Sequence, residues 1–476
     1  MKKLNALVLI AAALFLTSCF EDGDDNTIQR ISINDFVWKG MNYGYLYKSE
    51  IPNLADDRFV NTSEYSEYLD GFSSPEALFE SLIYQRQTVD RFSWIVDNYF
   101  VLEQNFEGTS KTTGMERILF RAPNSSNLIG VVRLVLPNTD ADIKGVKRGD
   151  IFYAVNGTEI TEANAFNLLN QDEYTINLGV FNDKGTPETT DDSIDPTGEN
   201  ITLTKFEYTE NPIFISDILE VQDEKVGYLM YNGFIGDSEN ALNPIFGQFK
   251  SNNIQHLVLD LRYNPGGSVP TTTALASMIT GQFTGQVFEK LIYNDNLQSQ
   301  NTDYVFANNL NGGALNSLGL NKIYVLTSRS SASASEGIIN GLKPYIDVVQ
   351  IGTNTRGKTQ ASRTFYDSPN FTRQGANPAH TYAMQPLVAI GLNKNNETVP
   401  STGLVPSIGF EYQERAFNLG VLGNENEPML ALALADIASS TTKMSKIKSE
   451  SGLQRQFELV VDENDFNPRE GGMIID

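Results

Sequence analysis

A serine-rich turn and a lysine further along the chain have the residue types needed for acyl-transfer chemistry. The serine cluster reads SSASASEG with Ser333 at its centre, and Lys358 follows 25 residues later in a Gly-Lys loop. A serine hydroxyl is a weak nucleophile at its ordinary pKa, so a base must accept its proton. A lysine can do this near pH 7 only if burial lowers its pKa by about three units. We therefore expect Lys358 to be drawn inward beside Ser333.

Histidine is the more common base, and the chain contains His256 and His380. His256 directly precedes an apolar strand and His380 lies in a polar loop, and neither has a clear acidic residue beside it to orient its ring. A Ser-His-Asp triad is therefore the less favoured interpretation. Taken alone, the serine cluster could also be an ordinary cap at the start of a helix.

The segments around Ser333 predict a strand, a tight turn and a helix in that order. An apolar run at Ile323–Leu326 precedes the serines, a helix is expected over Glu336–Ile346, and a second apolar run covers Val348–Ile351. This order lifts the serine to the carboxyl edge of a sheet, where the amides of a helix start stabilise negative charge. From Pro212 onward strands alternate with helices, which predicts an α/β fold.

An Asn-Pro-Gly-Gly turn at 264–267 follows a second buried strand, HLVLDLR. Its backbone N–H groups could face a neighbouring site, and a developing oxyanion needs such donors. Together, the serine cluster, the Gly-Lys loop and the DLRYNPGG segment resemble the C-terminal processing peptidases, also called tail-specific proteases. The resemblance implies peptide-bond hydrolysis with Ser333 as nucleophile and Lys358 as base. It also implies an oxyanion hole made by the amides of Gly266 or Gly267 and of Ala334.

Related enzymes often have a glutamine four positions after the lysine, where it orients the amine. Ser362 stands at that position here and Gln360 lies at plus two, so the third catalytic residue is Ser362 or Gln360, with Ser362 preferred on spacing. The resemblance further implies a multidomain α/β fold with a crotonase-like (ClpP/crotonase-type) core and no metal or organic cofactor. Two alternatives stay open: a catalytically inactive peptide-binding lipoprotein with this fold, and an esterase or amidase that uses the same dyad.

The composition and patterning of the chain predict several regions. Residues 30–110 carry apolar side chains at helical spacing, and residues 111–210 resemble a PDZ domain through LIGVVRLVLP and ADIKGVKRGDIFYAVNGTEI. A PDZ groove binds an extended peptide by adding it as a strand, although the usual Gly-rich carboxylate loop is not evident here. The acidic stretch 181–200 is interpreted as a hairpin insertion. The predicted regions are a signal peptide (1–18), an acidic tether (19–29), a helical domain (30–110), a PDZ-like domain (111–210), the peptidase domain (211–440) and a peripheral tail (441–476).

The first residues, MKKLNALVLIAAALFLTSCF, have the basic end and short apolar run of a secretory signal. Leu-Thr-Ser-Cys resembles a bacterial lipobox, which implies cleavage before Cys19 and its lipidation. Because Cys19 is the sole cysteine, an intramolecular disulfide and a cysteine metal cluster are excluded. We expect an exported cell-envelope lipoprotein of a Gram-negative bacterium, attached to the outer membrane by its lipid.

The formal charge of −24 disfavours nucleic acid as a partner, because such a surface repels phosphate backbones. The expected partners are therefore protein or peptide substrates.

Two other motifs are treated as chance matches. GTNTRGKT, at 352–359, has the Walker A spacing but no helical pattern after it, and Ser440–Lys443 has the S-x-x-K spacing at the end of a terminal helix.

Overall fold

The computed structural model describes residues 23–439, 444, 447, 457–463 and 473–474. Its central feature is a twisted sheet in the order β10-β11-β12-β18-β19, with β10 antiparallel to β11 and the remaining pairs parallel. The strands are β10 (Ile213–Val221), β11 (Glu224–Tyr231), β12 (His256–Asp260), β18 (Lys322–Thr327) and β19 (Asp347–Gly352). The inner strands are buried almost continuously, as expected for a parallel sheet covered on both faces.

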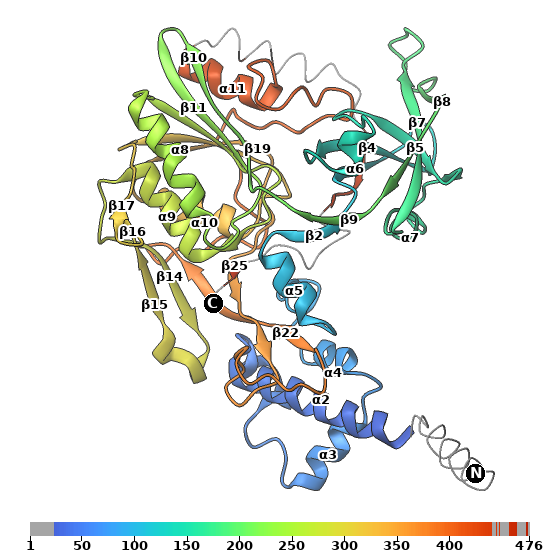
Figure 1. Ribbon diagram of the computed structural model, residues 1–476, viewed down its shortest axis with the longest axis vertical. Helices are drawn as coiled ribbons and strands as arrows, with labels where there is room; N and C mark the ends of the chain where they lie inside the picture. The colour runs from blue at the N-terminus through green and yellow to red at the C-terminus, as the bar shows by residue number, and fades with distance from the viewer. Residues whose placement is uncertain (1–22, 440–443, 445–446, 448–456, 464–472, 475–476) are drawn as a thin grey trace, which may run out of the picture.

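Helices cover both faces of this sheet (Figure 1). One face packs against α8 (Glu239–Ser251), α9 (Val269–Thr280) and α10 (Ala334–Leu342), and the other packs against α11 (Pro428–Ile437). Alternate residues of each strand enter the two cores: Ile323 and Val325 of β18 face the three helices, whereas Leu326 faces α11. The strands predicted at 323–326 and 348–351 and the helix predicted after the serines are therefore confirmed, with the helix ending at Leu342.

A second sheet lies beside the first, in the order β13-β25-β20-β23-β14-β15. Its strands are β13 (Gly267–Ser268), β14 (Val287–Tyr293), β15 (Thr302–Val305), β20 (Gln360–Ser362), β23 (Leu387–Leu392) and β25 (Met473–Ile474). Short elements complete this half of the chain: η3 (Asp295–Gln300), β16 (Asn309–Leu310), β17 (Gly313–Ala314), β21 (Phe365–Tyr366) and β22 (Ala383–Gln385). This sheet brings the segment after the Asn-Pro-Gly-Gly turn and the segment after Lys358 onto the same layer.

The N-terminal region is mainly helical and packs on the second sheet (Figure 1). Its elements are α2 (Gly23–Gly44), η1 (Lys48–Glu50), η2 (Pro52–Leu54), α3 (Thr62–Asp70), α4 (Pro75–Ser81), β1 (Trp94–Val96) and α5 (Tyr99–Phe106). Ser74 caps α4 through a hydrogen bond from the Ala77 amide, as its Ser-Pro-Glu start predicts. β1 joins β22 and β21 in a small sheet, which ties this region to the later part of the chain that forms the two larger sheets.

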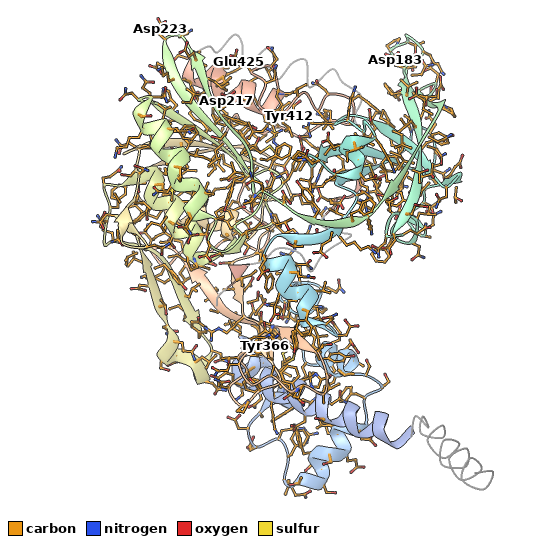
Figure 2. All side chains as sticks on the ribbon, in the orientation of Figure 1. Asp183, Asp217, Asp223, Tyr366, Tyr412 and Glu425 are labelled. Atoms are coloured by element: carbon orange, nitrogen blue, oxygen red, sulfur yellow. The ribbon has the colours of Figure 1, made fainter. Side chains whose placement is uncertain are left out.

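Residues 111–210 form a separate β-rich lobe (Figure 1). Its sheet runs β24-β3-β4-β5-β7-β8, with β6 paired to β5, and β2 pairs with β9 at its base. The elements are β2 (Thr109–Thr112), β3 (Met115–Arg121), β4 (Leu128–Val135), α6 (Asp140–Ile143), β5 (Ile151–Val155), β6 (Thr158–Glu159), α7 (Ala165–Leu169), β7 (Glu173–Asn182), β8 (Ser193–Thr204), β9 (Phe206–Thr209) and β24 (Leu459–Val461). The predicted hairpin at 181–200 is the β7–β8 turn, with Asp183 near its outer tip (Figure 2).

Three sequence predictions need correction. The helical spacing predicted over residues 30–110 is not continuous, because α4 ends at Ser81 and the chain turns at Gln85 with a φ of 44°. The predicted tether at 19–29 is helical from Gly23 onward. The tail predicted to be peripheral contributes β24 and β25 to two different sheets.

Residues 19 and 440–443 lie outside the described residues. Within the described ranges no helix has the length and apolar character to cross a bilayer.

Candidate active site

Ser333 lies in the sharp turn between β18 and α10. Its backbone φ is 58°, in the left-handed region that a non-glycine residue rarely adopts, and the residue is the N-cap of α10. The side chain is fully buried, and its Oγ has no hydrogen-bond partner among the described residues. A strained turn that presents an uncommitted hydroxyl at the start of a helix is the geometry of a nucleophile.

The Glu336 carboxylate joins the serine turn to the lysine loop. Its Oε2 accepts hydrogen bonds from the Ser333 amide (2.8 Å) and the Lys358 amide (2.9 Å). Its Oε1 accepts hydrogen bonds from the Thr355 hydroxyl and from the Gly357 amide at 2.7 Å. Burial raises the pKa of Glu336 above its ordinary value, while the four hydrogen bonds act in the opposite direction. One carboxylate therefore fixes the backbones of Ser333 and Lys358 relative to each other.

Lys358 is buried inside the protein, and the residue is only 3% exposed. Burial lowers its pKa from 10.5 to about 8, since the charged ammonium loses its hydration. Asp90 and Glu336 oppose this by favouring the charged form, and the positive charge of Arg356 lowers the pKa further. A substantial fraction of the amine is thus neutral at mildly alkaline pH, as general-base chemistry requires.

The N-terminal region forms one wall around this lysine. The Phe92 ring lies 5.1 Å from the Lys358 Nζ, and the Arg91 guanidinium donates to the carbonyl oxygens of Gly357 (3.0 Å) and Ser401 (3.1 Å). Asp90 accepts a hydrogen bond from the Tyr45 hydroxyl at 2.7 Å, which holds its charge in place. The Asp-Arg-Phe segment at 90–92 thus supports the lysine loop directly.

The Asn-Pro-Gly-Gly turn lies against the turn that carries Ser333. A Cβ added to Gly266, whose φ is 112°, would lie 2.8 Å from the Ser333 Cβ, and one added to Gly267 would lie 2.1 Å from the Phe234 carbonyl oxygen. Both positions therefore require glycine. The Gly266 amide, however, donates to the Asn264 side chain at 2.9 Å, so this predicted oxyanion donor is already engaged. The Gly267 and Ala334 amides are the remaining predicted donors.

Two other serines of the cluster, together with Ser328 just before it, hold the two turns together. Ser331 Oγ donates to the Leu261 carbonyl (2.7 Å), Ser335 Oγ donates to the Asn264 carbonyl (2.9 Å), and Ser328 Oγ donates to the Arg262 carbonyl. These bonds leave Ser333 as the cluster's member without a structural partner in the described part of the chain.

Arg262 anchors the base of the Asn-Pro-Gly-Gly turn through buried ion pairs. Its guanidinium is fully buried and contacts the carboxylates of Asp260 (2.8 Å), Glu427 (2.7 Å) and Glu414 (3.1 Å). Glu427 also caps α11 by accepting a hydrogen bond from the Leu430 amide. Removing one partner of a buried pair typically costs about 3–5 kcal/mol, so this network fixes the end of β12 and the turn that follows it.

The two candidates for a third residue both lie on β20, directly after the lysine loop. Gln360 donates through Nε2 to the Tyr47 hydroxyl at 2.8 Å, and its Oε1 is buried with no partner among the described residues. Ser362 is 3% exposed and lies two residues further along the same strand. In an extended strand these two side chains face the same side.

Both histidines do have acidic partners, contrary to the sequence interpretation, but neither pair belongs to this site. His256 contacts Glu224 at the start of β12, whereas Ser333 follows the opposite, carboxyl ends of the parallel strands. His380 contacts Asp367 at 3.0 Å and packs on Phe36 of the N-terminal region. These carboxylates are distant in sequence or lie in other strands, so local inspection missed them.

The Walker A match has no phosphate-binding structure. β19 ends at Gly352, an irregular loop follows, and the chain continues into β20, so no helix begins directly after Lys358.

Sequence inspection overlooked two residues of the site. Glu336 was assigned only to the expected helix, although its place three residues after an N-cap serine is a capping-box signal. Asp90 had no signal of its own, because its role depends on long-range packing.

Parts of the chain match known proteins. Residues 225–371 match the model of peptidase family S41, and residues 32–94 match that of the peptidase S41 N-terminal domain. A carboxyl-terminal-processing protease of Picosynechococcus is 26% identical over 231 residues, which cover 48% of this chain and 50% of that protein. A probable CtpA-like serine protease of Staphylococcus aureus is 30% identical over 145 residues, covering 30% and 27%. The matches thus span half or less of these curated relatives.

Two solved structures share the fold over most of the chain. A putative S41 protease from Bacteroides fragilis is 25% identical with a TM-score of 0.67, and the match covers 85% of this chain and 97% of that one. A photosystem II D1 C-terminal processing protease is 16% identical with a TM-score of 0.50, over 86% of this chain and 98% of that one. The architecture is therefore a multidomain α/β fold of the S41 protease type, with a helical N-terminal region.

The carboxylate of Glu336 provides a test of this geometry. In Glu336→Gln an amide N–H₂ replaces one oxygen, so at least one of the two donor pairs loses its acceptor. We expect the free energy of unfolding to fall by about 1–3 kcal/mol, the usual cost of leaving buried donors unsatisfied. Urea denaturation measures it. Glu425→Gln, on the exposed surface near α11 (Figure 2), is the matched control, and equal stability of both variants would contradict the role of Glu336.

Proposed function

We propose that this chain, which carries a serine-type peptidase domain of family S41, hydrolyses peptide bonds in exported proteins or peptides through a Ser333–Lys358 dyad. The observation that carries the proposal is the shared Glu336 carboxylate, which accepts hydrogen bonds from the amides of both residues. The lowered pKa of the buried Lys358 amine, about 8, supports its role as base. The segment that matches the S41 family, 225–371, contains both residues.

In the proposed mechanism, the neutral Lys358 amine takes the proton of Ser333 as Oγ attacks the scissile carbonyl carbon. The oxyanion that forms accepts hydrogen bonds from the Ala334 amide at the start of α10 and from the Gly267 amide. When the C–N bond breaks, the Lys358 ammonium gives its proton to the leaving amine. A water then loses a proton to Lys358 and attacks the acyl-serine, which releases the carboxylate product and restores the hydroxyl.

Several finer assignments belong to the same proposal. Ser362 orients the Lys358 amine in preference to Gln360, because the Gln360 amide is committed to Tyr47. The catalytic core is crotonase-like, and residues 111–210 are a PDZ-like module that selects C-terminal or unstructured segments of the substrate. An antiparallel sheet with short flanking helices, present at 111–210, supports that module.

The dyad is tested by substitution. We expect Ser333→Ala and Lys358→Ala each to lower kcat/KM by about 10³-fold or more on an unstructured protein such as casein, because each removes a group that acts in the transition state. Fragment mass spectrometry and initial rates measure the loss, and Ser63→Ala on the exposed surface of α3 is the control. Peptide binding with no Ser333-dependent cleavage would replace the enzyme by a binding module.

The pH dependence tests the identity of the base. If neutral Lys358 is the reactive form, kcat/KM rises with pH through an apparent pKa of about 8. Asp90→Asn removes a negative charge that favours the ammonium, so the midpoint should fall by up to about one pH unit. Arg356→Gln removes a positive charge and should raise the midpoint by a similar amount. Shifts of the two variants in the same direction, or no shifts, would exclude Lys358 as the titrating base.

We also propose that Cys19 is lipidated after signal cleavage and anchors the protein to the cell envelope, at the outer membrane. The Leu-Thr-Ser-Cys sequence after a short apolar run supports this. Expression of the full precursor in a Gram-negative host with a labelled fatty acid should give a labelled, membrane-associated protein. Cys19→Ser should remove the label and release the protein, whereas retained labelling would contradict the proposal.

A further inference from the structure

Two short strands from the last part of the chain fill positions in two different sheets. β24 pairs antiparallel with β3, and β25 pairs in parallel with both β13 and β20. We propose that these two strands with the described residues beside them, 458–463 and 473–474, which together we call the tail, occupy the binding path of an extended peptide substrate and are displaced when a substrate binds. The proposal rests on the peptidase function proposed above and names the peptide-binding surfaces that it uses.

The first surface is the slot between β13 and β20. In the sheet order β25 stands between these two strands, so without it they are separated by the width of one strand. Strands in a sheet lie about 4.8 Å apart, which makes the slot about 9 to 10 Å across and suited to one extended backbone. β13 begins at Gly267 and β20 begins at Gln360, directly after Lys358. A peptide in this slot therefore runs between the proposed oxyanion donor and the proposed base.

A cavity beside this slot can take a substrate side chain. It has a volume of about 170 Å³, and Ile474 of β25 lines it together with Gly266 and Gly267. Its other walls include the apolar side chains of Trp94, Phe106 and Phe234. The cavity thus favours an apolar residue of an extended peptide at the position that Ile474 now holds.

The second surface is the edge of β3. In the order β24-β3-β4, β3 would be an outer strand with unpaired backbone groups if β24 were absent. Addition of an antiparallel strand to such an edge is a common mode of peptide recognition. The Arg121 amide donates to the Glu458 carbonyl at 2.9 Å, and Val461 packs on the core of the lobe. The registered pairs are Leu459 with Phe120 and Val461 with Leu119.

Charged contacts define which peptide fits this edge. Asp462 is 5% exposed and accepts hydrogen bonds from Arg133 (3.1 Å) and from the Ser330 hydroxyl (2.7 Å). Glu463 accepts a hydrogen bond from the Arg117 amide at 2.9 Å and lies 3.3 Å from its guanidinium. The surface therefore fits an extended segment in which apolar residues precede an acidic pair, as Leu-Val-Val-Asp-Glu does in the tail.

Because the tail is part of the same chain, its effective concentration at these surfaces is on the order of millimolar, far above that of a free peptide. A weakly paired strand then suffices to compete with substrate. Each described tail strand is short, β25 being two residues and β24 three, so a longer substrate strand can replace it. The consequence is a raised KM in the intact chain with little effect on kcat.

The first experiment weakens the tail in the full-length protein. Proline at 474 lacks the N–H group and disfavours an inner strand position, so Ile474→Pro should release β25. We expect KM for an unstructured protein to fall by about 3- to 10-fold with kcat unchanged, and a smaller change for Ile474→Ala, which keeps the backbone pairing. Thr189→Pro, on the exposed β7–β8 turn, is the control for proline itself. An unchanged or raised KM in Ile474→Pro would overturn the proposal at this slot.

The second experiment measures binding without catalysis. A fluorescent peptide that copies residues 456–476 is titrated onto Ser333→Ala and onto Ser333→Ala/Ile474→Pro, with a scrambled peptide as control. We expect binding of the native sequence only, and at least about threefold tighter binding to the double variant. Equal binding of both peptides, or none, would overturn the proposal. If Ile474→Pro does not fold, Val461→Pro makes the same comparison at the β3 edge.

These results separate the two proposals. If the tail peptide binds but the protein shows no Ser333-dependent cleavage, the peptidase function is refuted and the peptide-binding surfaces are retained. Ser333-dependent cleavage with no effect of the tail on KM and no peptide binding would keep the peptidase and refute the tail as a competitor.

Discussion

The buried carboxylate of Glu336 accepts hydrogen bonds from the Ser333 turn on one side and from the lysine loop on the other. Without a shared acceptor, the strained backbone at Ser333 and the irregular loop before β20 would have independent freedom. The burial of Glu336 makes these hydrogen bonds necessary, since a carboxylate in a low dielectric is stable only when its oxygens are fully hydrogen-bonded. The sheet, the serine side chains and the Arg262 ion pairs all act to keep that acceptor and its donors in register.

Holding the Lys358 amine in this environment has a free-energy cost. A pKa decrease from 10.5 to about 8 corresponds to about 3 kcal/mol against the charged form. The folded protein therefore gains stability as pH rises from about 8 toward 10.5, because the unfolded chain holds its proton over that range. The N-terminal region helps to exclude water from the amine: Phe92 lies over it, and Arg91 binds the carbonyl oxygens of its loop. The helical region is thus part of the proposed active site and not an appendage.

Local patterns in the sequence predicted the parts of the site that depend on neighbours in the chain. Apolar runs predicted β18 and β19, and the serine cluster after the first run predicted the turn at Ser333. Burial of Lys358 followed from the chemistry that a neutral amine requires. Contacts between distant segments could not be predicted in this way. The Asn264 side chain that occupies the Gly266 amide and the Asp90 charge near Lys358 both depend on tertiary packing.

The same limitation explains why the tail was expected to be peripheral. Residues 459–461 form too short a strand to give a pattern, and they pair with β3, which is distant in the sequence. Arg133, buried to 1% exposure, pairs with two carboxylates, Glu116 on β3 and Asp462, and Ser330 of the serine cluster donates to the Asp462 carboxylate. Removing one partner of a buried ion pair is destabilising, even though Glu116 would remain beside Arg133. A peptide that displaces β24 therefore binds better if it brings a carboxylate that replaces Asp462, which connects recognition at the β3 edge to the turn that presents Ser333.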